Sequence, residues 1–299
     1  MPNTLVHFAA QGAASRGLWP RLDARWIYLG CLLPDVPWIL RRAVVGFGIP
    51  VDVFDLRLYT MALASLAGTL LLCAALALAT VAPRLVLAVL GTNALFHLLL
   101  DATELKFGNG VHLAAPLSWR MTSFELLPGE STVYLVLAAA GALLVAWELT
   151  RPRNADLRFV VTPWRLVASA ALLAAYLLFP LPFLGAIEAS DSYSVKTLRE
   201  VEARPGRAVR LDRTSFHPTP SGGVVELWTG ESVRATGALP RHEGTVSLEG
   251  TFLAPDVLRI DRLFEHRQNR DWPSYVALLL LGVLWARPLW PRRHAGGTT

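Results

Sequence analysis

Lysine and cysteine are scarce in this chain of 299 residues, and charged residues of all kinds make up only 17% of it. Lys106 and Lys196 are the only lysines, so arginine supplies almost all of the positive charge behind the net charge of +5. The two cysteines, Cys31 and Cys73, lie in apolar segments and leave the polar part of the chain without a disulfide. No run of aromatic residues alternates with the arginines, which argues against nucleic acid as a partner.

The N-terminus also lacks the basic segment and apolar core of a cleavable signal, and we expect it to be retained. What the chain has in abundance is apolar residues, which make up 53% of it and form long runs without a single charge. This composition is typical of an integral membrane protein that lies in a lipid bilayer. The runs predict five membrane-spanning helices, at about 61–82, 85–101, 131–149, 164–187 and 275–289.

Two further apolar segments do not suit a straight span. Residues 3–14 predict a short helix with Asn3 as N-cap, lying at the membrane interface or inside the bundle. Residues 26–45 contain Pro34-Asp35 and Pro37, and these prolines predict a broken or re-entrant segment that places Asp35 at membrane depth.

A polar block over residues 188–273 changes both composition and period. Turn signals separate five runs in which apolar and polar residues alternate, and this pattern predicts five short β-strands. A small barrel of OB type fits their number and length, although five alternating strands are compatible with several folds. The runs are AVRLDR, GVVELW, SVRATG, TVSLEG and VLRIDRLF.

The predicted fold is therefore mainly α, a polytopic helical bundle with a small all-β domain inserted before the last span. We divide it into a helical membrane domain (1–187), an extracytoplasmic β-rich domain (188–273), and a final transmembrane helix with a cytoplasmic tail (274–299). The arginine-rich composition is compatible with a bacterial source, so the expected location is the bacterial cytoplasmic (inner) membrane. Arginines that flank the later spans predict which segments are cytoplasmic, namely Arg151, Arg153, Arg158, Arg165, Arg287, Arg292 and Arg293.

Four ionisable residues lie in apolar surroundings, where an unpaired polar group is costly. His97 and Asp101 are four residues apart on one helix face, and His7 and Asp35 lie in the two earlier segments. Two imidazoles and two carboxylates suit a zinc, manganese or iron ion. Each residue also has an ordinary explanation, such as an interfacial histidine, a Pro-Asp turn, or a hydrogen bond between His97 and Asp101.

The same residues occur in short motifs whose order and spacing, over residues 1–150, resemble the YdjM-type, LexA-regulated, membrane-bound metal-dependent hydrolases. The motifs are LVHFA around His7, the LLPD element that ends at Asp35, and a helix with Gly91, His97 and Asp101 followed by Gly108, Gly110 and Pro116-Leu117-Ser118. The resemblance implies that a divalent metal ion, zinc first, is bound by His7, Asp35, His97 and Asp101.

Hydrolysis would then follow from a metal-bound water, with Asp35 or Asp101 as the base. Glu104, three residues beyond Asp101 and predicted on the same helical face, is a further catalytic candidate that would hold an imidazole or the water, the alternative being a solvated carboxylate at a helix end. A lipid or lipid-linked phosphoester is the expected substrate at the extracytoplasmic face. Arg57 and Arg120 would receive its anionic group, or would simply meet lipid headgroups.

The chain departs from the family pattern after the LLPD element. An HRGxTHS-like motif is typical there, and residues 55–65 keep Arg57 and Thr60 but neither histidine; Trp38 stands near the place of another. Asp55 is either a substitute ligand or a solvated loop carboxylate. The absence of these histidines argues against a second metal ion. It favours an alternative function, that of a non-catalytic membrane protein whose exported β-domain binds an envelope partner. A transporter is a third interpretation, but no inverted repeat supports it.

Overall fold

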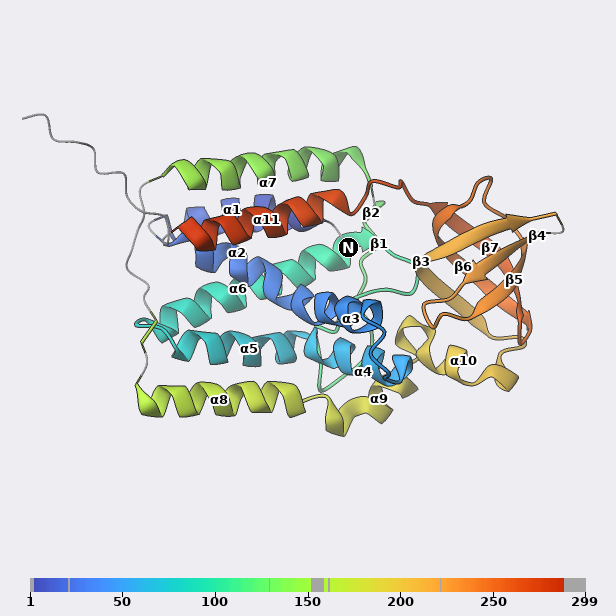
Figure 1. Cartoon of the computed structure of the whole chain (residues 1–299), viewed down its shortest axis with the longest axis horizontal. Coiled ribbons are helices and arrows are strands. Elements are labelled where there is room, and N and C mark those ends of the chain that lie inside the picture. Colours follow the sequence, from blue (N-terminus) through green and yellow to red (C-terminus); the bar gives the residue numbers. More distant parts are fainter. Residues whose placement is uncertain are drawn as a thin grey trace, which may run out of the picture.

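The computed structural model describes residues 3–20, 22–128, 130–151, 159–160, 162–220 and 222–287, which form a helical bundle with a β-barrel at one end (Figure 1). Its helices are α1 (Thr4–Leu18), α2 (Ala24–Leu32), α3 (Val36–Gly46), α4 (Val53–Leu63), α5 (Leu66–Leu78), α6 (Pro83–Thr103), α7 (Thr132–Thr150), α8 (Pro163–Leu178), α9 (Leu184–Ala189), α10 (Val195–Arg199) and α11 (Trp272–Ala286). Its strands are β1 (Glu104–Leu105), β2 (Leu127–Pro128), β3 (Ala208–Thr219), β4 (Gly222–Glu226), β5 (Ser232–Gly237), β6 (Gly244–Ala254) and β7 (Val257–Glu265).

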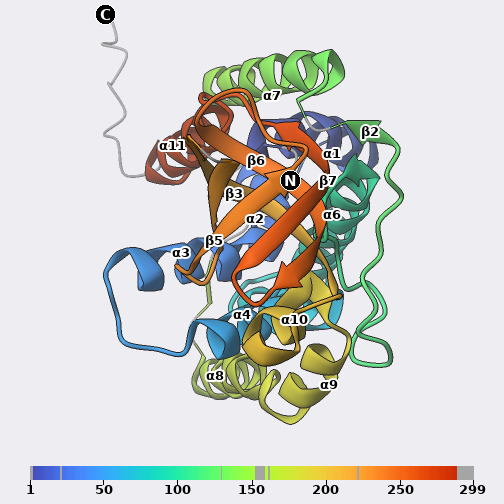
Figure 2. The ribbon, with the colours of Figure 1, turned by 90° about the vertical axis from the view of Figure 1, so that its right-hand side faces the viewer.

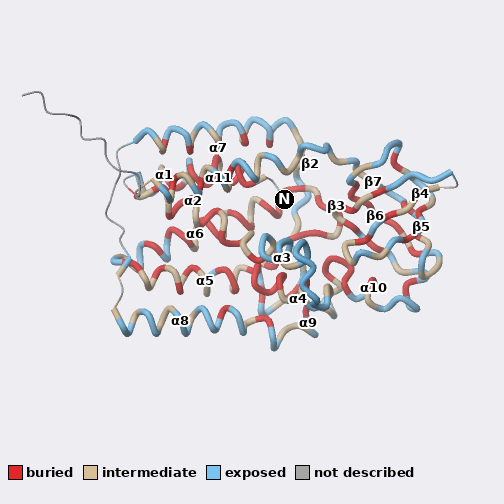
Figure 3. The backbone as a smooth tube through the Cα atoms, viewed as in Figure 1, coloured by how far each residue is buried: buried red, intermediate tan, exposed pale blue. Residues whose placement is uncertain are grey.

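Helix α1 lies inside the bundle, packed against α2, α6, α7 and α11. Its predicted cap is confirmed, because the Asn3 side chain accepts a hydrogen bond of 3.2 Å from the Val6 amide. Figure 3 shows α1, α2 and α6 largely buried, whereas α7 and α8 are exposed along their outer faces. Those outer faces carry large apolar side chains such as Leu135, Leu143 and Leu173, as expected of a surface that faces lipid.

Three helical stretches in the described part of the chain are long and apolar enough to cross a membrane: α6, α7 and Pro163–Ala189, which runs from α8 to α9. Helices α4 and α5 pass the same test together, as a pair bent by 66°, so the described residues contain three or four candidate spans where five were predicted. Helix α11 is apolar, but it has only 15 residues, about 22 Å at ~1.5 Å per residue.

The helix predicted over 61–82 is interrupted near its start, because the chain bends between Leu63 and Leu66. Ser65 starts a new helix there, and its hydroxyl accepts a hydrogen bond of 3.2 Å from the Gly68 amide. A Cβ atom on Gly68 would lie 2.6 Å from the carbonyl oxygens of both Ala62 and Leu63, so the tight bend requires glycine at this position.

The interruption predicted for residues 26–45 is confirmed. Helix α2 ends at Leu32, a 3₁₀ turn covers Leu33–Asp35, and α3 begins at Val36. Pro37 falls in the first turn of α3, where a missing amide hydrogen breaks no helical hydrogen bond. The turn holds Asp35 beside α6, with its side chain 14% exposed.

The five predicted strands form a closed barrel in the order β3-β4-β5-β7-β6. The pair β5 and β7 is parallel, and the other neighbouring pairs are antiparallel. Alternate residues of β3, among them Leu211 and Phe216, point into an apolar core that they share with Leu248 and Phe252. The strands begin only at Ala208, because residues 181–203 form short helical turns, including α9 and α10, that contact α4.

The C-terminal ends of α7 and α11 and the N-terminal end of α8 lie at the end of the bundle that is far from the barrel (Figure 1), and Arg151, Arg287 and Arg165 belong to these helix ends. Arg287 donates to the carbonyl oxygens of Glu148 and Arg151, and Arg165 donates to that of Thr80 at 2.8 Å. Arg153, Arg158, Arg292 and Arg293 lie outside the described residues. Seen from the opposite end, the barrel lies in front of the bundle, with α7 and α8 on opposite sides of it (Figure 2).

Candidate metal centre

Three predicted residues meet where α1 and α6 approach the barrel side of the bundle. His7 comes from the first turns of α1, and His97 and Asp101 come from the last turns of α6. One ligand atom from each lies within 4.8 Å of the other two, and all three residues are buried. This group can hold a metal ion.

The spacing of these atoms fits a shared ion better than direct hydrogen bonds. His7 Nε2 lies 3.4 Å from Asp101 Oδ1, and His97 Nε2 lies 3.6 Å from Asp101 Oδ2. Ligand atoms ~2.0–2.2 Å from one ion in a tetrahedron are about 3.3–3.6 Å apart. The two imidazole rings stack in parallel, with centroids 3.9 Å apart and an interplanar angle of 9°.

Hydrogen bonds on the far side of each imidazole orient its Nε2 toward the shared centre. His97 Nδ1 lies 2.6 Å from the carbonyl oxygen of Cys31 and donates to it. The Gln11 amide lies 2.9 Å from His7 Nδ1, and with its oxygen turned to the ring it accepts the Nδ1 hydrogen. Both Nε2 atoms then carry a lone pair, and neither has a hydrogen-bond partner among the described residues. Outer hydrogen bonds of this kind are usual for metal-ligating histidines.

Asp35 stands at one side of this group. Its Oδ1 atom is 3.5 Å from His97 Nε2, but it is not within 4.8 Å of all the other ligand atoms. The carboxylate also lines a cavity of about 750 Å³ between the bundle and the barrel. Asp35 therefore links the buried group to this cavity.

Lys106 was missed by sequence reasoning, although it is one of only two lysines. Its ammonium is 2% exposed and lies 3.8 Å from both Asp101 Oδ1 and Glu104 Oε2. Glu104 is not on the helical face of Asp101, because α6 ends at Thr103 and Glu104 begins β1. It is buried rather than solvated, and it pairs with Lys106 and, at 3.2 Å, with Arg270.

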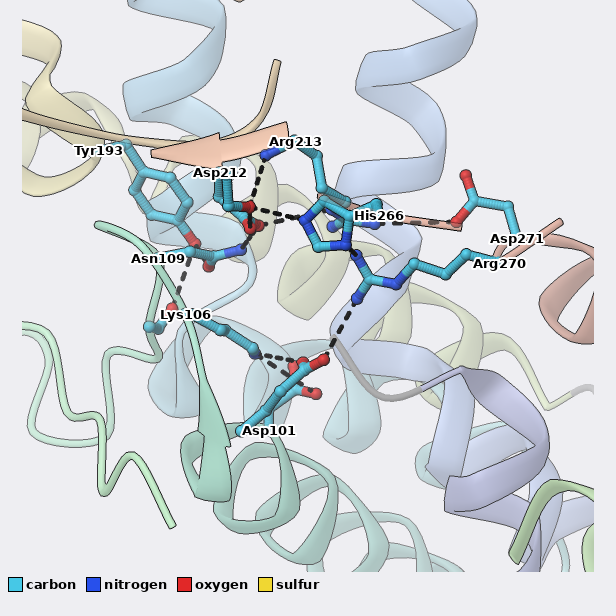
Figure 4. A network of polar contacts seen from close by, with 12 residues as sticks. Asp101, Lys106, Asn109, Tyr193, Asp212, Arg213, His266, Arg270 and Asp271 are labelled. Carbon is cyan, nitrogen blue, oxygen red and sulfur yellow. Dashed lines mark hydrogen bonds and ion pairs between the residues drawn. The ribbon is translucent and has the colours of Figure 1, made fainter. Parts of the chain in front are cut away.

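A chain of polar contacts joins this region to the barrel (Figure 4). Arg270 lies 3.4 Å from His266, whose Nε2 is 2.8 Å from the hydroxyl of Ser247, and this hydroxyl donates to Asp212 at 2.8 Å. The contacts continue through Asn109, which donates to Asp212 at 2.8 Å and accepts from the Tyr193 hydroxyl at 2.6 Å.

These contacts perturb ionisation at the barrel. Burial alone raises the pKa of Asp212, but the Arg213 guanidinium and the donors Asn109 and Ser247 outweigh it and hold that pKa well below its ordinary value. Burial lowers the pKa of His266, against the opposing effect of Glu130. Asp212 is therefore anionic, and sequence reasoning had no signal for it because nothing in β3 marks it as a contact of a loop about a hundred residues away.

The remaining candidates lie apart from the centre. Asp55 is a solvated carboxylate, 60% exposed and 2.5 Å from Arg199, and Arg120 is exposed. His112 was not predicted, yet it is buried beside a cavity of about 20 Å³ that His97 and Asp101 also line. Burial lowers the pKa of His112 to about 4, so its imidazole is neutral.

No protein-family model, curated protein or solved structure matches this chain. The chain thus combines helices able to span a membrane, a small β-barrel and a buried His/His/Asp group that can hold a metal ion.

Proposed function

We propose that this chain is a membrane-embedded, metal-dependent hydrolase of the YdjM type that acts on a lipid-linked phosphoester. The observation that carries the proposal is the convergence of His7 Nε2, His97 Nε2 and Asp101, with the far nitrogen of each imidazole already hydrogen-bonded. The order of the LLPD and His97–Asp101 motifs supports the same family. Zinc is the first choice of metal, because histidine nitrogens and a carboxylate oxygen are ligands that suit it.

The chain supplies the other parts that hydrolysis requires. A divalent ion held by His7, His97 and Asp101 would lower the pKa of a bound water toward neutrality. Asp35 lies beside His97 and lines the large cavity, so it is placed to accept a proton from the cavity side. Lys106 offsets the negative charge of Asp101 and Glu104, while Glu104 acts through Lys106 and Arg270 rather than through an imidazole.

Topology supports a site at the extracytoplasmic face of a bacterial inner membrane. Arg151, Arg165 and Arg287 belong to helix ends that lie together at one end of the bundle, and the positive-inside rule favours a cytoplasmic location for that end and for the C-terminus. The barrel and the metal centre then lie toward the opposite side. The barrel supports an OB-type domain on that side, because its first and fourth strands pair in antiparallel fashion and its third and fifth strands pair in parallel.

Metal content of the full-length protein, purified in detergent, tests the proposal. We expect about one zinc, manganese or iron ion per chain, and loss of that ion in His97→Ala and in Asp101→Ala. His217→Ala is the matched control, because this histidine is half exposed in the barrel and 3.2 Å from Glu243. A wild-type protein that binds no divalent ion under reconstitution would refute the metal centre.

Turnover is tested separately with phosphatidic acid and phosphatidylglycerol in mixed micelles. We expect the metal-loaded wild type to cleave a phosphoester, and Asp35→Asn to keep the ion while losing about 10²-fold or more in rate. If the loaded wild type cleaves neither lipid, the non-catalytic alternative holds, in which an ion only ties α1 to α6 and the barrel recruits a partner.

A further inference from the structure

Arg57 is a buried cation that has no carboxylate partner in the described part of the chain. It lies in α4, is 8% exposed and lines the large cavity between bundle and barrel. Within the described residues, no acidic side chain lies within 4.0 Å of its guanidinium, and its Nε and Nη1 atoms have no hydrogen-bond acceptor. A buried charge in this state is costly unless something else in the site compensates it.

Aromatic rings compensate only part of that cost. The guanidinium carbon of Arg57 lies 4.1 Å from the ring centre of Trp228, 4.9 Å from that of Tyr193 and 6.0 Å from that of Trp38. Cation–π contacts of this kind satisfy the flat faces of a guanidinium. They leave its N–H edge without acceptors, and that edge recognises planar or tetrahedral oxyanions.

A second arginine of the same cavity, Arg41, is partly buried. It lies on α3, with its guanidinium 5.9 Å from the ring centre of Trp228, and its buried Nε atom has no hydrogen-bond partner among the described residues. The neighbouring cavity arginines differ, because Arg213 contacts Asp212 and Asp271, and Arg270 contacts Glu104 and Glu130.

From these contacts we infer that Arg57 and Arg41 form a phosphate-binding subsite in this cavity. The two arginines converge on Trp228 from separate helices, and their free N–H groups supply the donors that a phosphate requires. The cavity volume of about 750 Å³ is within the range of small-molecule sites. Asp35 lines the same cavity, so a phosphoester held at Arg57 would lie on the side of the metal centre that is open to it.

The cavity lining also indicates where the rest of such a molecule would lie. Ile39 of α3, Leu135 of α7, and Tyr275 and Leu278 of α11 contribute apolar surface to the same cavity. Ile39, Leu135 and Tyr275 are partly exposed on the bundle, where lipid chains would run. A phosphate on a lipid would therefore place its head at the arginines and its chains between α3, α7 and α11. The phosphate-binding subsite deepens the proposed function. It rests on that function only in taking the cavity to be the substrate site.

The test is calorimetric binding to the full-length protein in a neutral detergent, with dioctanoyl phosphatidic acid in one arm and inorganic phosphate in the other. We expect Arg57→Gln to weaken binding by about 10- to 100-fold, because a buried charged hydrogen-bond donor is lost. Arg57→Lys should recover only part of the affinity, since it keeps the charge but not the fork of donors. Arg41→Gln should also weaken binding, whereas the control Arg42→Gln, already 4.0 Å from Asp271, should change it by less than about 3-fold.

Two further measurements make the outcome decisive. Arg57→Leu removes an uncompensated buried charge, so its ligand-free thermal midpoint should be no lower than that of the wild type while binding is lost. Binding by the His97→Ala variant should be retained, because the subsite does not use the metal ligands. Tighter binding of the lipid identifies a lipid headgroup as the natural ligand, and equal binding of inorganic phosphate identifies a free phosphate.

Equal affinity of wild type and Arg57→Gln, or no binding of either compound by the wild type, would overturn the subsite. The metal-dependent hydrolase could then still stand on its own test. A protein that binds phosphatidic acid through Arg57 but holds no metal ion would support the subsite and refute the hydrolase.

Discussion

Gly141 lies where α7 crosses α1. The two helices are so close at this point that no side chain fits between them. A Cβ atom at this position would overlap the carbonyl oxygen of Leu5 and lie 2.9 Å from its carbonyl carbon and 3.1 Å from the Ala9 amide nitrogen. Ordinary contact begins at 3.4 Å, so the carbonyl carbon alone requires a shift of about 0.5 Å (3.4 − 2.9). The obstacle is backbone, which cannot rotate away as a flexible side chain would.

The Gly141→Ala substitution therefore sets two effects of opposite sign against each other. Alanine is the better helix former by ~1 kcal/mol, whereas overpacking against a rigid neighbour costs ~3 kcal/mol. We expect a net loss of about 2 kcal/mol in the free energy of unfolding. Because α1 carries His7 two residues beyond Leu5, and metal ligands tolerate only about ±0.2 Å, we also expect weaker metal binding.

Unfolding in detergent, monitored by intrinsic fluorescence, measures the change in stability. The metal content of the purified variant measures the change in metal binding. Gly282→Ala is the matched control, since Gly282 lies within α11 and a Cβ atom there would meet nothing within 4 Å. That control should be neutral or stabilising by up to ~1 kcal/mol. If Gly141→Ala were as stable as Gly282→Ala and kept its metal ion, the close α1–α7 contact would not be a constraint in solution.

Two further predictions concern Gln11 and Asp212, which act through the neighbouring His7 and Arg213. Gln11→Leu removes the acceptor behind His7, so metal affinity should fall by about 10- to 100-fold with little change in the fold, and unchanged affinity would show that the Gln11 contact does not orient the ring. Asp212→Asn leaves the partly buried Arg213 with only the more distant Asp271 as an anion and should cost about 1–3 kcal/mol at pH 7, measured by unfolding of the full-length protein. Because the folded-state pKa of Asp212 is depressed, its contribution is complete above the ordinary value of about 4 and declines as the pH falls below it, so the gap between the two proteins should narrow in acid. A gap that stays constant from pH 7 to pH 3 would contradict this assignment.

The secondary structure followed from local signals where those signals were strong. The Asn3 cap, the break at Pro34 and Pro37, and the five alternating strands of the barrel were all predictable, because capping, proline geometry and side-chain alternation depend only on nearby residues. The bend at Ser65 was not, because a run without charge resembles a straight span. Only the close approach of Gly68 to the carbonyls of Ala62 and Leu63 shows why the helix turns there.

For the metal centre, too, the sequence indicated the candidate residues and the tertiary structure decided how they are arranged. Polar residues in apolar segments are costly, so the sequence alone was enough to single out His7, Asp35, His97 and Asp101 as candidates. Which of them meet was decided by the packing of α1 against α6, which brings residues about ninety positions apart to 3.4 Å. The same packing placed Asp35 at the edge of the group rather than at its centre.

The sequence by itself determined the apolar helices, the barrel strands and the residue types able to bind a metal, because these depend on composition and short-range periodicity. Only the tertiary structure decided the tautomers set by Gln11 and Cys31, the burial of Lys106 and the free donors of Arg57 in the cavity. The physical reason is that a side chain's hydrogen bonds and electrostatic partners come from whichever segments pack against it. No local pattern specifies those segments, and here they lie on different helices and on the barrel.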